Sequence, residues 1–485
     1  MTAYLRSYAR PAQLKTRFMR ILIYGVYWLH LHPCAWIPVV SSSLVSQTMN
    51  SGTRQKFVSL EWLRYFLGLY IVLFHTFNYP EVPGWLRKFF EMGFFSTSAF
   101  FVLSGFLLAH VYLRDQGQAQ AHMPGSRKSF WVKRLANLYP IHLGSFFLMV
   151  AVFAVLPMLG IIPSDATMSL RQVTIDSNNW SPFADMQHTM SDAELYLALF
   201  MNATLLHAWN PYYLTFNFPT WSISTLFFLY LLFPVLAPWL SRLKSPVRAL
   251  IVTNLLYLLP VIICIAMGWF SSPETGILHR NPIIRLPEFV AGILLCALYH
   301  QQVRQGVRLT RGWVATLLAV LIGSLVGASL LLTYAGELSS KGNVSYFLVH
   351  DGLLLPAQLA LIYLCVHIPN PSPSSLLARW AKPFGNCSLS LFALHMPLFM
   401  LFARADRVFD GNPRLCFTDL TGCLAAAGDK SAWHYPLFLV LLTLLCIYFQ
   451  KSFVERVRAW IEKLLLSAKQ QPATHVANAS TGPLP

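Results

Sequence analysis

The feature that most constrains this chain is a series of long apolar runs, each close to the length of a membrane crossing. A helix needs about 20 consecutive apolar residues to span a bilayer. Only 11% of the 485 residues are charged, whereas an ordinary soluble domain has about 25%. The runs are continuous and lack the alternation of membrane β-barrel strands. We therefore expect an all-α, polytopic integral membrane protein.

Ten spans can be placed on these runs. They are expected at about 57–79, 93–113, 139–160, 222–240, 249–269, 284–301, 313–333, 348–367, 385–404 and 433–450. An even number puts both termini on one side of the membrane. The loops on that side hold 20 lysines and arginines and the opposite loops hold 8, so the positive-inside rule predicts that both termini are cytoplasmic. This distribution explains the net charge of +17, and nucleic acid is not an expected partner.

The regions outside these spans differ in character. The chain is divided into an N-terminal extension (1–48), a transmembrane domain (49–460) and a polar tail (461–485). The basic extension is interpreted as an interfacial segment or as an over-long gene model with its true start at Met49; a signal peptide is the alternative. The tail is expected to be disordered. The long loop 161–221 is a place to expect substrate contacts, and its apolar stretch 195–209 should lie along the outer surface or dip partway into the membrane.

The first span, LEWLRYFLGLYIVLFH (60–75), contains Glu61, Arg64 and His75. His75 lies eleven positions after Arg64, which places both side chains on one face of a helix, about 16 Å apart along its axis. Glu61 can pair with Arg64 one turn away. A buried ion pair with a hydrogen-bonded core histidine is the alternative, but an intramembrane arginine costs at least about 2.5 kcal/mol and usually lines a polar cavity. We expect a polar slot between helices.

Other polar residues lie near the ends of later spans. Arg285 and Glu288 can form an ion pair at the outer end of the sixth span. His395, two residues before a proline in the ninth span, suits a structural hydrogen bond or a role in the chemistry. His350 and Asp351 suit sugar binding or a solvated pair.

The serines and cysteines are assigned mainly structural roles. Ser222 and Ser224 are expected to hydrogen-bond between helices rather than act as nucleophiles. Cys416 and Cys423 share a polar loop and can form a disulfide in an oxidising compartment. Five cysteines in apolar runs are interpreted as packing residues: Cys264, Cys296, Cys365, Cys387 and Cys446. No C-x-x-C pair occurs, so no metal site is expected.

Seven segments carry a family resemblance. They are the first span with its Arg-x10-His spacing, FFSTSAFFVLSGFLLAHVYL (94–113), FWVKRLANLYPIHL (130–143), FPTWSISTLFFLYLLFPVL (218–236), RLPEFVAGILL (285–295), FGNCSLSLFALHMPLF (384–399) and YFQKSFVERVRAW (448–460). In kind and order they resemble the membrane acyltransferase family 3 proteins. Two positions depart from that pattern. Leu226 replaces an acidic residue, and Asn137 replaces the second Arg of an Arg-x-x-Arg motif.

The resemblance implies a multi-pass enzyme of the bacterial inner membrane. It would transfer an acyl group, usually acetyl, from coenzyme A to a hydroxyl of an extracytoplasmic glycan or glycolipid. Acyl-coenzyme A is then a substrate, and no permanently bound cofactor is expected. His75 would act as general base, with an acyl-histidine as the variant, while Arg64, oriented by Glu61, would hold the donor or stabilise the oxyanion.

The remaining site residues fall into two groups. Arg127, Lys128, Lys133 and Arg134 are expected on a cytoplasmic loop where the phosphates of coenzyme A can dock. Arg285, Glu288 and His395 are the expected substrate contacts.

Two other functions stay open at this point. A polar slot among ten spans also suits a transporter or exporter of a small polar molecule, although the two halves show no internal repeat. A non-catalytic scaffold that binds polysaccharide synthesis proteins is the other alternative, and the loss of an acidic residue at Leu226 is consistent with it.

Overall fold

The computed structural model describes residues 56–77, 84–113, 126–158, 170–176, 186–334, 343–428 and 432–466. Ten helices in this part of the chain are long and apolar enough to cross a membrane. The predicted all-α, ten-span membrane fold is therefore confirmed, while the side on which the termini lie stays a prediction. The N-terminal extension 1–48 and the tail beyond residue 466 fall outside the described residues.

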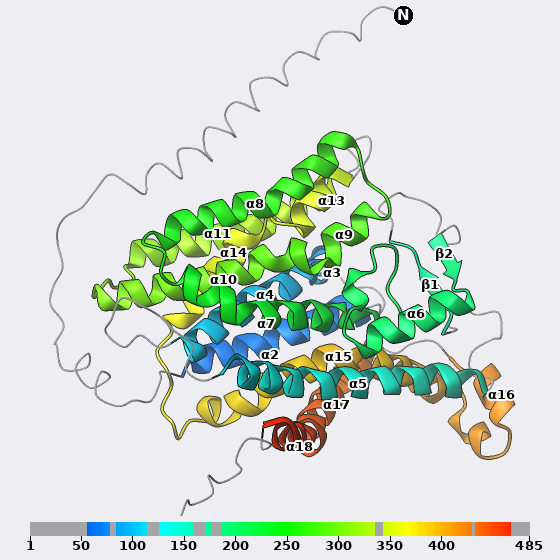
Figure 1. Ribbon diagram of the computed structural model, residues 1–485. Coiled ribbons are helices and arrows are strands. Elements are labelled where there is room, and N and C mark those ends of the chain that lie inside the picture. Colours follow the sequence, from blue (N-terminus) through cyan, green and yellow to red (C-terminus); the bar gives the residue numbers. More distant parts are fainter. Residues whose placement is uncertain are drawn as a thin grey trace, which may run out of the picture. The chain divides into compact units, whose positions relative to one another are not determined.

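The described part of the chain consists mainly of helices (Figure 1). They are α2 (Val58–Thr76), α3 (Gly84–Glu91), α4 (Phe94–Tyr112), α5 (Arg127–Met158), α6 (Asp192–Ala203), α7 (Trp221–Leu240), α8 (Pro246–Met267), α9 (Glu274–Arg280), α10 (Pro282–Arg304), α11 (Arg311–Thr333), α13 (Asn343–His350), α14 (Leu355–Val366), α15 (Leu376–Asp410), α16 (Leu420–Ala425), α17 (Tyr435–Phe449) and α18 (Glu455–Leu466). Single turns are η3 (His207–Trp209), η4 (Phe218–Thr220), η5 (Pro413–Phe417), η6 (Ala432–His434) and the π-helical η7 (Gln450–Val454).

Several boundaries differ from the sequence prediction, among them those of the third, ninth and tenth spans. The third span was expected at 139–160, but α5 begins at Arg127. The basic segment that was assigned to a loop therefore forms the first turns of this helix. At the other end of the chain, α18 continues to Leu466, so the first residues assigned to the tail are helical.

The long loop before α7 contains the strands of the described structure. β1 (Gln172–Thr174) pairs antiparallel with β2 (Gln187–Thr189), and Val173 lies opposite His188. α6 follows and covers the first part of the apolar stretch 195–209. Its twelve residues are too few to cross a bilayer, and Tyr196, Leu197 and Phe200 are exposed on it, as expected of a segment that lies along a surface.

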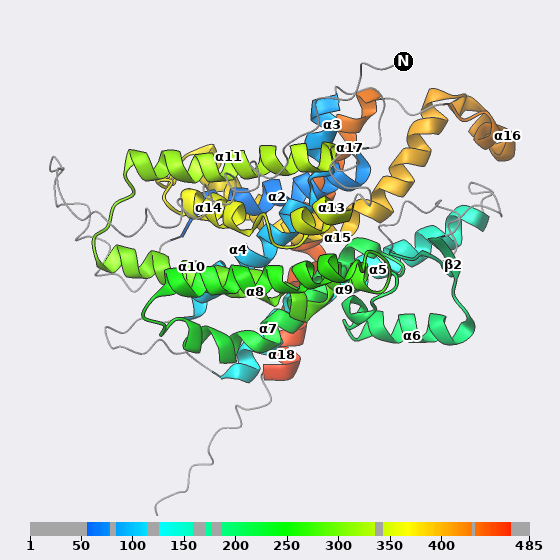
Figure 2. The same cartoon turned by 90° about the horizontal axis from the view of Figure 1, so that it is seen from above.

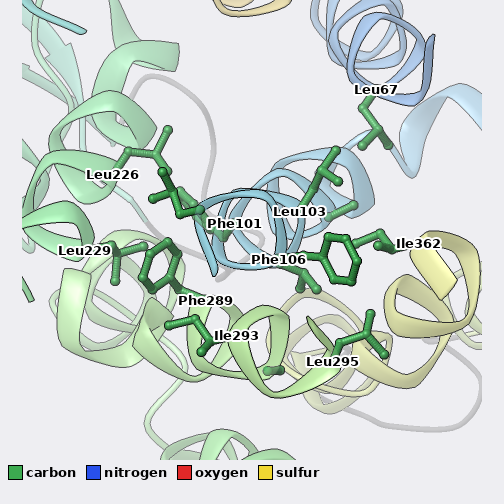
Figure 3. Packing of buried hydrophobic residues seen from close by; sticks show 14 of the residues in the cluster. Leu67, Phe101, Leu103, Phe106, Leu226, Leu229, Phe289, Ile293, Leu295 and Ile362 are labelled. Carbon is green, nitrogen blue, oxygen red and sulfur yellow. The ribbon is translucent and has the colours of Figure 1, made fainter. Parts of the chain in front are cut away.

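α4 occupies the centre of the main core. It packs against α10 on one side and α2 on the other, and the two views of the ribbon agree on this order (Figures 1 and 2). Figure 3 shows Phe101 and Phe106 of α4 surrounded by apolar side chains from α2, α7, α10 and α14. By contrast, α11 exposes apolar residues such as Ile322 and Leu330. Exposed apolar side chains on an outer helix are typical of a lipid-facing surface.

Reciprocal glycines allow the closest helix contacts. A Cβ at Gly105 of α4 would overlap the main chain of α10 at Phe289, and a Cβ at Gly292 of α10 would overlap the main chain of α4 at Val102. Small residues at such crossings let two backbones approach in a membrane, where no hydrophobic force drives helices together. Gly105 and Gly292 belong to two of the family-like segments, so this packing explains why those segments contain glycine.

A disulfide joins Cys416 and Cys423, as the sequence suggested. It closes a short loop between η5 and α16. Cys264, Cys387 and Cys446 are buried in the apolar interior, which agrees with their interpretation as packing residues.

The contact between α4 and α10 can be tested at Gly292. We expect Gly292→Ala to lower the thermal midpoint of the detergent-solubilised protein, because overpacking of this kind costs about 1–3 kcal/mol. The matched control is Gly323→Ala on α11, where an added Cβ meets nothing within 4 Å. Fluorescence-detected size-exclusion chromatography after heating measures both variants, and equal midpoints for the two would contradict the close packing.

Candidate active site

α2 presents its polar residues to α15. Glu61 and Arg64 form the predicted ion pair, with 3.1 Å between Oε2 and Nη1. Their side chains keep 32% and 27% of their accessible surface. Glu61 lies against Gly385, where any side chain would collide with its carboxylate. The glycine of the segment FGNCSLSLF therefore makes room for the acid of the first span.

The same side of α2 brings His75 to His395. Gly68 contacts Ser388, and His75 Nδ1 lies 2.9 Å from His395 Nε2, so α2 and α15 run parallel. The planes of the two imidazole rings are nearly parallel, with an interplanar angle of 3°. His395 is fully buried. The structure thus joins two histidines that are 320 residues apart in the sequence.

Hydrogen bonding fixes the tautomer of both rings. His395 Nδ1 lies 2.7 Å from the Phe392 carbonyl oxygen. A carbonyl can only accept, so Nδ1 of His395 carries the proton and its Nε2 accepts in the neutral ring. His75 Nδ1 must then donate to that Nε2, and His75 Nε2 keeps an unprotonated lone pair. His75 is therefore oriented as a base.

The outer loop reaches this histidine pair. Phe218 of η4 packs edge-on against His75, with ring centroids 5.4 Å apart. The neighbouring Asn217 donates from Nδ2 to the Ala393 carbonyl at 2.8 Å, two residues before His395. Asn217 Oδ1 is buried and makes no hydrogen bond among the described residues. Asn217 was not predicted as a site residue, because a single amide before a proline-containing turn has no distinctive sequence pattern.

A buried ionic network lies beside the pair. Arg285 contacts Glu288 Oε1 and Asp351 Oδ1, each at 3.1 Å. Tyr257 donates to Glu288 at 2.7 Å and accepts from Arg285. The predicted Arg285–Glu288 pair is confirmed, but Asp351 and Tyr257 were not anticipated as its partners.

His350 and Asp351 do not form the solvated pair that was one of the two expectations. Asp351 keeps only 3% of its surface, and its carboxylate faces Arg285. Sugar binding by these residues stays a prediction. His350 stacks on Phe94 and Tyr346, with centroids 3.7 Å apart in both cases. The desolvation of the arginine and the acid makes such mutual pairing necessary.

His279 links the network to the histidine pair. Its carbonyl accepts from Arg285 Nε at 2.7 Å, and its ring lies 4.8 Å from that of Trp221. Trp221 begins α7 directly after η4, and Phe218 of η4 packs against His75. Sequence reasoning missed His279 because it sits in a short helix between two predicted spans.

The four basic residues near position 130 lie at the other end of the helices. They are on α5 rather than on a loop, as noted above. Arg134 donates to the Tyr112 hydroxyl at 2.6 Å, and its guanidinium lies over Tyr112 and Phe130. Arg127 and Lys128 are exposed, and Lys133 is partly buried. Asn137 follows one turn after Arg134 on the same helix.

The two expected structural serines behave differently. Ser224 donates to the Leu205 carbonyl at 2.6 Å and accepts from the Ala208 amide at 3.1 Å. Ser222 donates to the Pro219 carbonyl within its own turn, its one hydrogen bond in the part of the chain that the structure describes. Leu226, where the family resemblance led us to expect an acid, is 5% exposed and belongs to the apolar core.

The outer loop is anchored by neutral histidines. His207 of η3 is buried and stacks on His142 of α5, with centroids 5.1 Å apart. Burial lowers the pKa of His207 to about 3, and the nearby His142 contributes to this shift. Glu194, which caps α6, has its pKa lowered to about 2 by hydrogen bonds from the Ser191 amide and from His188. The anchoring of this loop is therefore independent of pH near neutrality.

Comparison with known proteins identifies the family of this chain. Residues 57–451 match the family model Acyl_transf_3, described as an acyltransferase domain. The chain is also similar to the acyltransferase MdmB of Streptomyces mycarofaciens, with 25% identity over 319 residues, or 59% of this chain and 71% of that protein. No solved structure matches. Because the family model covers most of the chain, including α2, α4, α10 and α15, the protein belongs to the acyltransferase 3 family and is a multi-pass membrane acyltransferase.

Proposed function

We propose that this acyltransferase moves an acetyl group from acetyl-coenzyme A to a hydroxyl of an extracytoplasmic glycan or glycolipid, in the inner membrane of a bacterium. The single observation that carries the proposed chemistry is the hydrogen-bond chain from the Phe392 carbonyl through His395 to His75. This chain of hydrogen bonds leaves His75 Nε2 without a proton and with a free lone pair. The named relative, an acyltransferase, supports acyl transfer in general.

The reaction follows from the orientation of His75. Nε2 removes the proton from the acceptor hydroxyl as its oxygen attacks the thioester carbonyl. The tetrahedral intermediate then collapses, the carbon–sulfur bond breaks, and the departing thiolate takes the proton from Nε2. The products are an ester and free coenzyme A, and His75 returns to its starting tautomer. His395 acts as a positioning residue, because its neutral Nε2 stabilises the imidazolium that forms between the two steps.

The distance between Arg64 and His75 limits what Arg64 can do. Arg64 and His75 lie about 16 Å apart along α2, so the guanidinium does not reach a carbonyl held at His75. This geometry favours donor binding over oxyanion stabilisation for Arg64, with Glu61 fixing its orientation. Arg285 donates to Glu288 and to the His279 carbonyl, so we assign it to bracing α9 and α10. Glu288 Oε2 is buried without a hydrogen-bond partner among the described residues, so Glu288 stays a candidate substrate contact.

The donor can lie along the helices between the two ends. Phe57, which precedes α2, packs against His110 near the end of α4 that also carries Tyr112. The helical rise from Phe57 to His75 is about 27 Å. The Arg134–Tyr112 pair lies near the Phe57 end, so it is separated from His75 by about this distance along the helix axis. Coenzyme A has phosphates at one end and a thiol at the other, joined by a long pantetheine arm. Phosphates at Arg134 and Lys133, with Arg127 at the rim, would leave the thioester pointing toward His75.

The acceptor would approach from the outer loop. Phe218 and Asn217 contact the histidine pair and its helix directly. The unused Oδ1 of Asn217 is a ready acceptor for a sugar hydroxyl.

The base assignment is tested by His75→Ala. Loss of a general base lowers turnover by about 100-fold to 10,000-fold, so we expect no detectable O-acetyl group on surface glycan, with normal membrane expression. His188→Ala, in the outer loop, is the control histidine variant. Mass spectrometry of the glycan measures both. Retained acetylation in His75→Ala would contradict the role of His75, and loss of the entire polymer would indicate a scaffold or exporter.

The positioning role of His395 is tested by two substitutions. His395→Phe keeps an aromatic ring but removes the acceptor for His75 Nδ1, so kcat should fall at least about 10-fold while KM for the donor stays constant. His395→Asn supplies a carbonyl oxygen at a similar place and should recover part of the lost kcat. Steady-state kinetics in proteoliposomes separate these outcomes. Equal losses for the two variants, or a change confined to KM, would argue for a packing role alone.

Donor binding is tested at Arg134. Arg134→Ala should raise KM for acetyl-coenzyme A about 10-fold, equivalent to about 1.4 kcal/mol, with little change in kcat. Arg311→Ala, at the exposed start of α11, is the matched control for the loss of a cationic side chain. An unchanged KM in Arg134→Ala would place the phosphates elsewhere.

A further inference from the structure

A second cluster of reactive side chains lies away from the histidine pair. His110 projects from α4, and Cys296 and His300 project from α10. Cys296 and His300 are four residues apart, so they share one face of their helix. One ligand atom from each residue lies within 4.8 Å of the other two. His110 Nδ1 and His300 Nε2 are 3.2 Å apart.

The cluster is shielded from water on several sides. His110 keeps 8% of its surface and Cys296 keeps 2%, while His300 is partly exposed. The ring of Phe57 lies 4.9 Å from His110, and that of Tyr299 lies 5.4 Å from His300. Aromatic neighbours of this kind hold the imidazoles in place. The partial exposure of His300 leaves a route by which a small ion can enter.

The donor set and the spacing of its two nitrogens suit a zinc site. In tetrahedral coordination, two nitrogens at Zn–N distances of about 2.0–2.1 Å are about 3.3–3.4 Å apart. The observed separation of 3.2 Å needs almost no adjustment. The nitrogens are also at a hydrogen-bonding distance, so the spacing suits a direct histidine pair as well. The thiol distinguishes the two cases, because imidazole and thiolate together are the ligands that zinc prefers.

We propose that His110, Cys296 and His300 bind one Zn²⁺ ion, with water as the fourth ligand. Binding converts the Cys296 thiol to a thiolate, and its proton passes to solvent. No metal site was expected from the sequence, because no C-x-x-C pair occurs. The proposed ligands come instead from two helices that are far apart in the chain. Cys296, interpreted as a packing residue, becomes a ligand.

The ion would clamp α4 to α10 beyond their glycine contact. Gly105 and Gly292 set the close approach of the two helices, and the cluster lies one to two turns further along each helix. Because the cluster is near the end of α4 that contacts Phe57, it is remote from His75. The inference is therefore independent of the proposed acetyl transfer.

Metal content of the full-length protein tests this proposal. The protein is purified in detergent with an affinity tag that contains no histidine, and zinc is measured by mass spectrometry. We expect about one zinc per chain in the wild type and at least a five-fold loss in Cys296→Ser and in His300→Ala. Cys264→Ser, which removes another buried thiol from α8, should keep the wild-type content.

Cobalt substitution gives a second readout that does not depend on activity. Co²⁺ bound to the wild type should show a thiolate-to-cobalt charge-transfer band in the near ultraviolet, and Cys296→Ser should lack that band while remaining monodisperse. If the wild type is isolated without zinc, titration against a chromophoric chelator measures its affinity directly. A wild-type affinity for zinc no higher than that of Cys296→Ser would overturn the proposal. So would copper bound in place of zinc, or the same cobalt spectrum in Cys296→Ser as in the wild type.

Discussion

The hydrogen bond between His75 and His395 is the interaction on which the account of the active site depends. It has a direction, because the Phe392 carbonyl can only accept and so determines which nitrogen of His395 carries the proton. That direction passes to His75 and leaves its Nε2 unprotonated. The parallel packing of α2 on α15 supplies the geometry, and glycines at positions 68 and 385 allow the two helices to come close enough.

The remaining polar groups hold this pair in place. Arg285, Glu288, Asp351 and Tyr257 pair with one another in the interior. Arg285 also donates to the His279 carbonyl of α9, and the His279 ring packs on Trp221. Buried charges of this kind are costly to break, because removal of one partner leaves the others uncompensated. The network is thus a rigid support beside a histidine that must hold one tautomer.

Sequence patterns predicted interactions within a helix well. The ten spans, the Glu61–Arg64 pair and the Arg285–Glu288 pair follow from hydropathy and from the spacing of neighbours on one helix face. Contacts between helices were harder to predict, since nothing local marks which face meets which. Asp351 beside Arg285, His395 beside His75, and His110 beside Cys296 all join segments that are far apart in the chain.

The predicted ends of the spans were wrong where hydropathy falls before the helix ends. The basic turns at the start of α5 were assigned to a loop because hydropathy falls there, although the helix continues through charged residues that lie outside the apolar core. The structure also shows the surroundings of the two residues that depart from the family pattern. Leu226 is buried among apolar side chains, and Asn137 lies one turn from Arg134 on the same helix.

The tautomer of His75 is the most direct test of the central claim. Nitrogen NMR of the detergent-solubilised protein with ¹⁵N-labelled histidine, assigned by comparison with His75→Gln, reports the protonation of each ring nitrogen. We expect a proton on Nδ1 and none on Nε2 of His75 at neutral pH. A proton on Nε2, or a doubly protonated ring under the same conditions, would contradict the account.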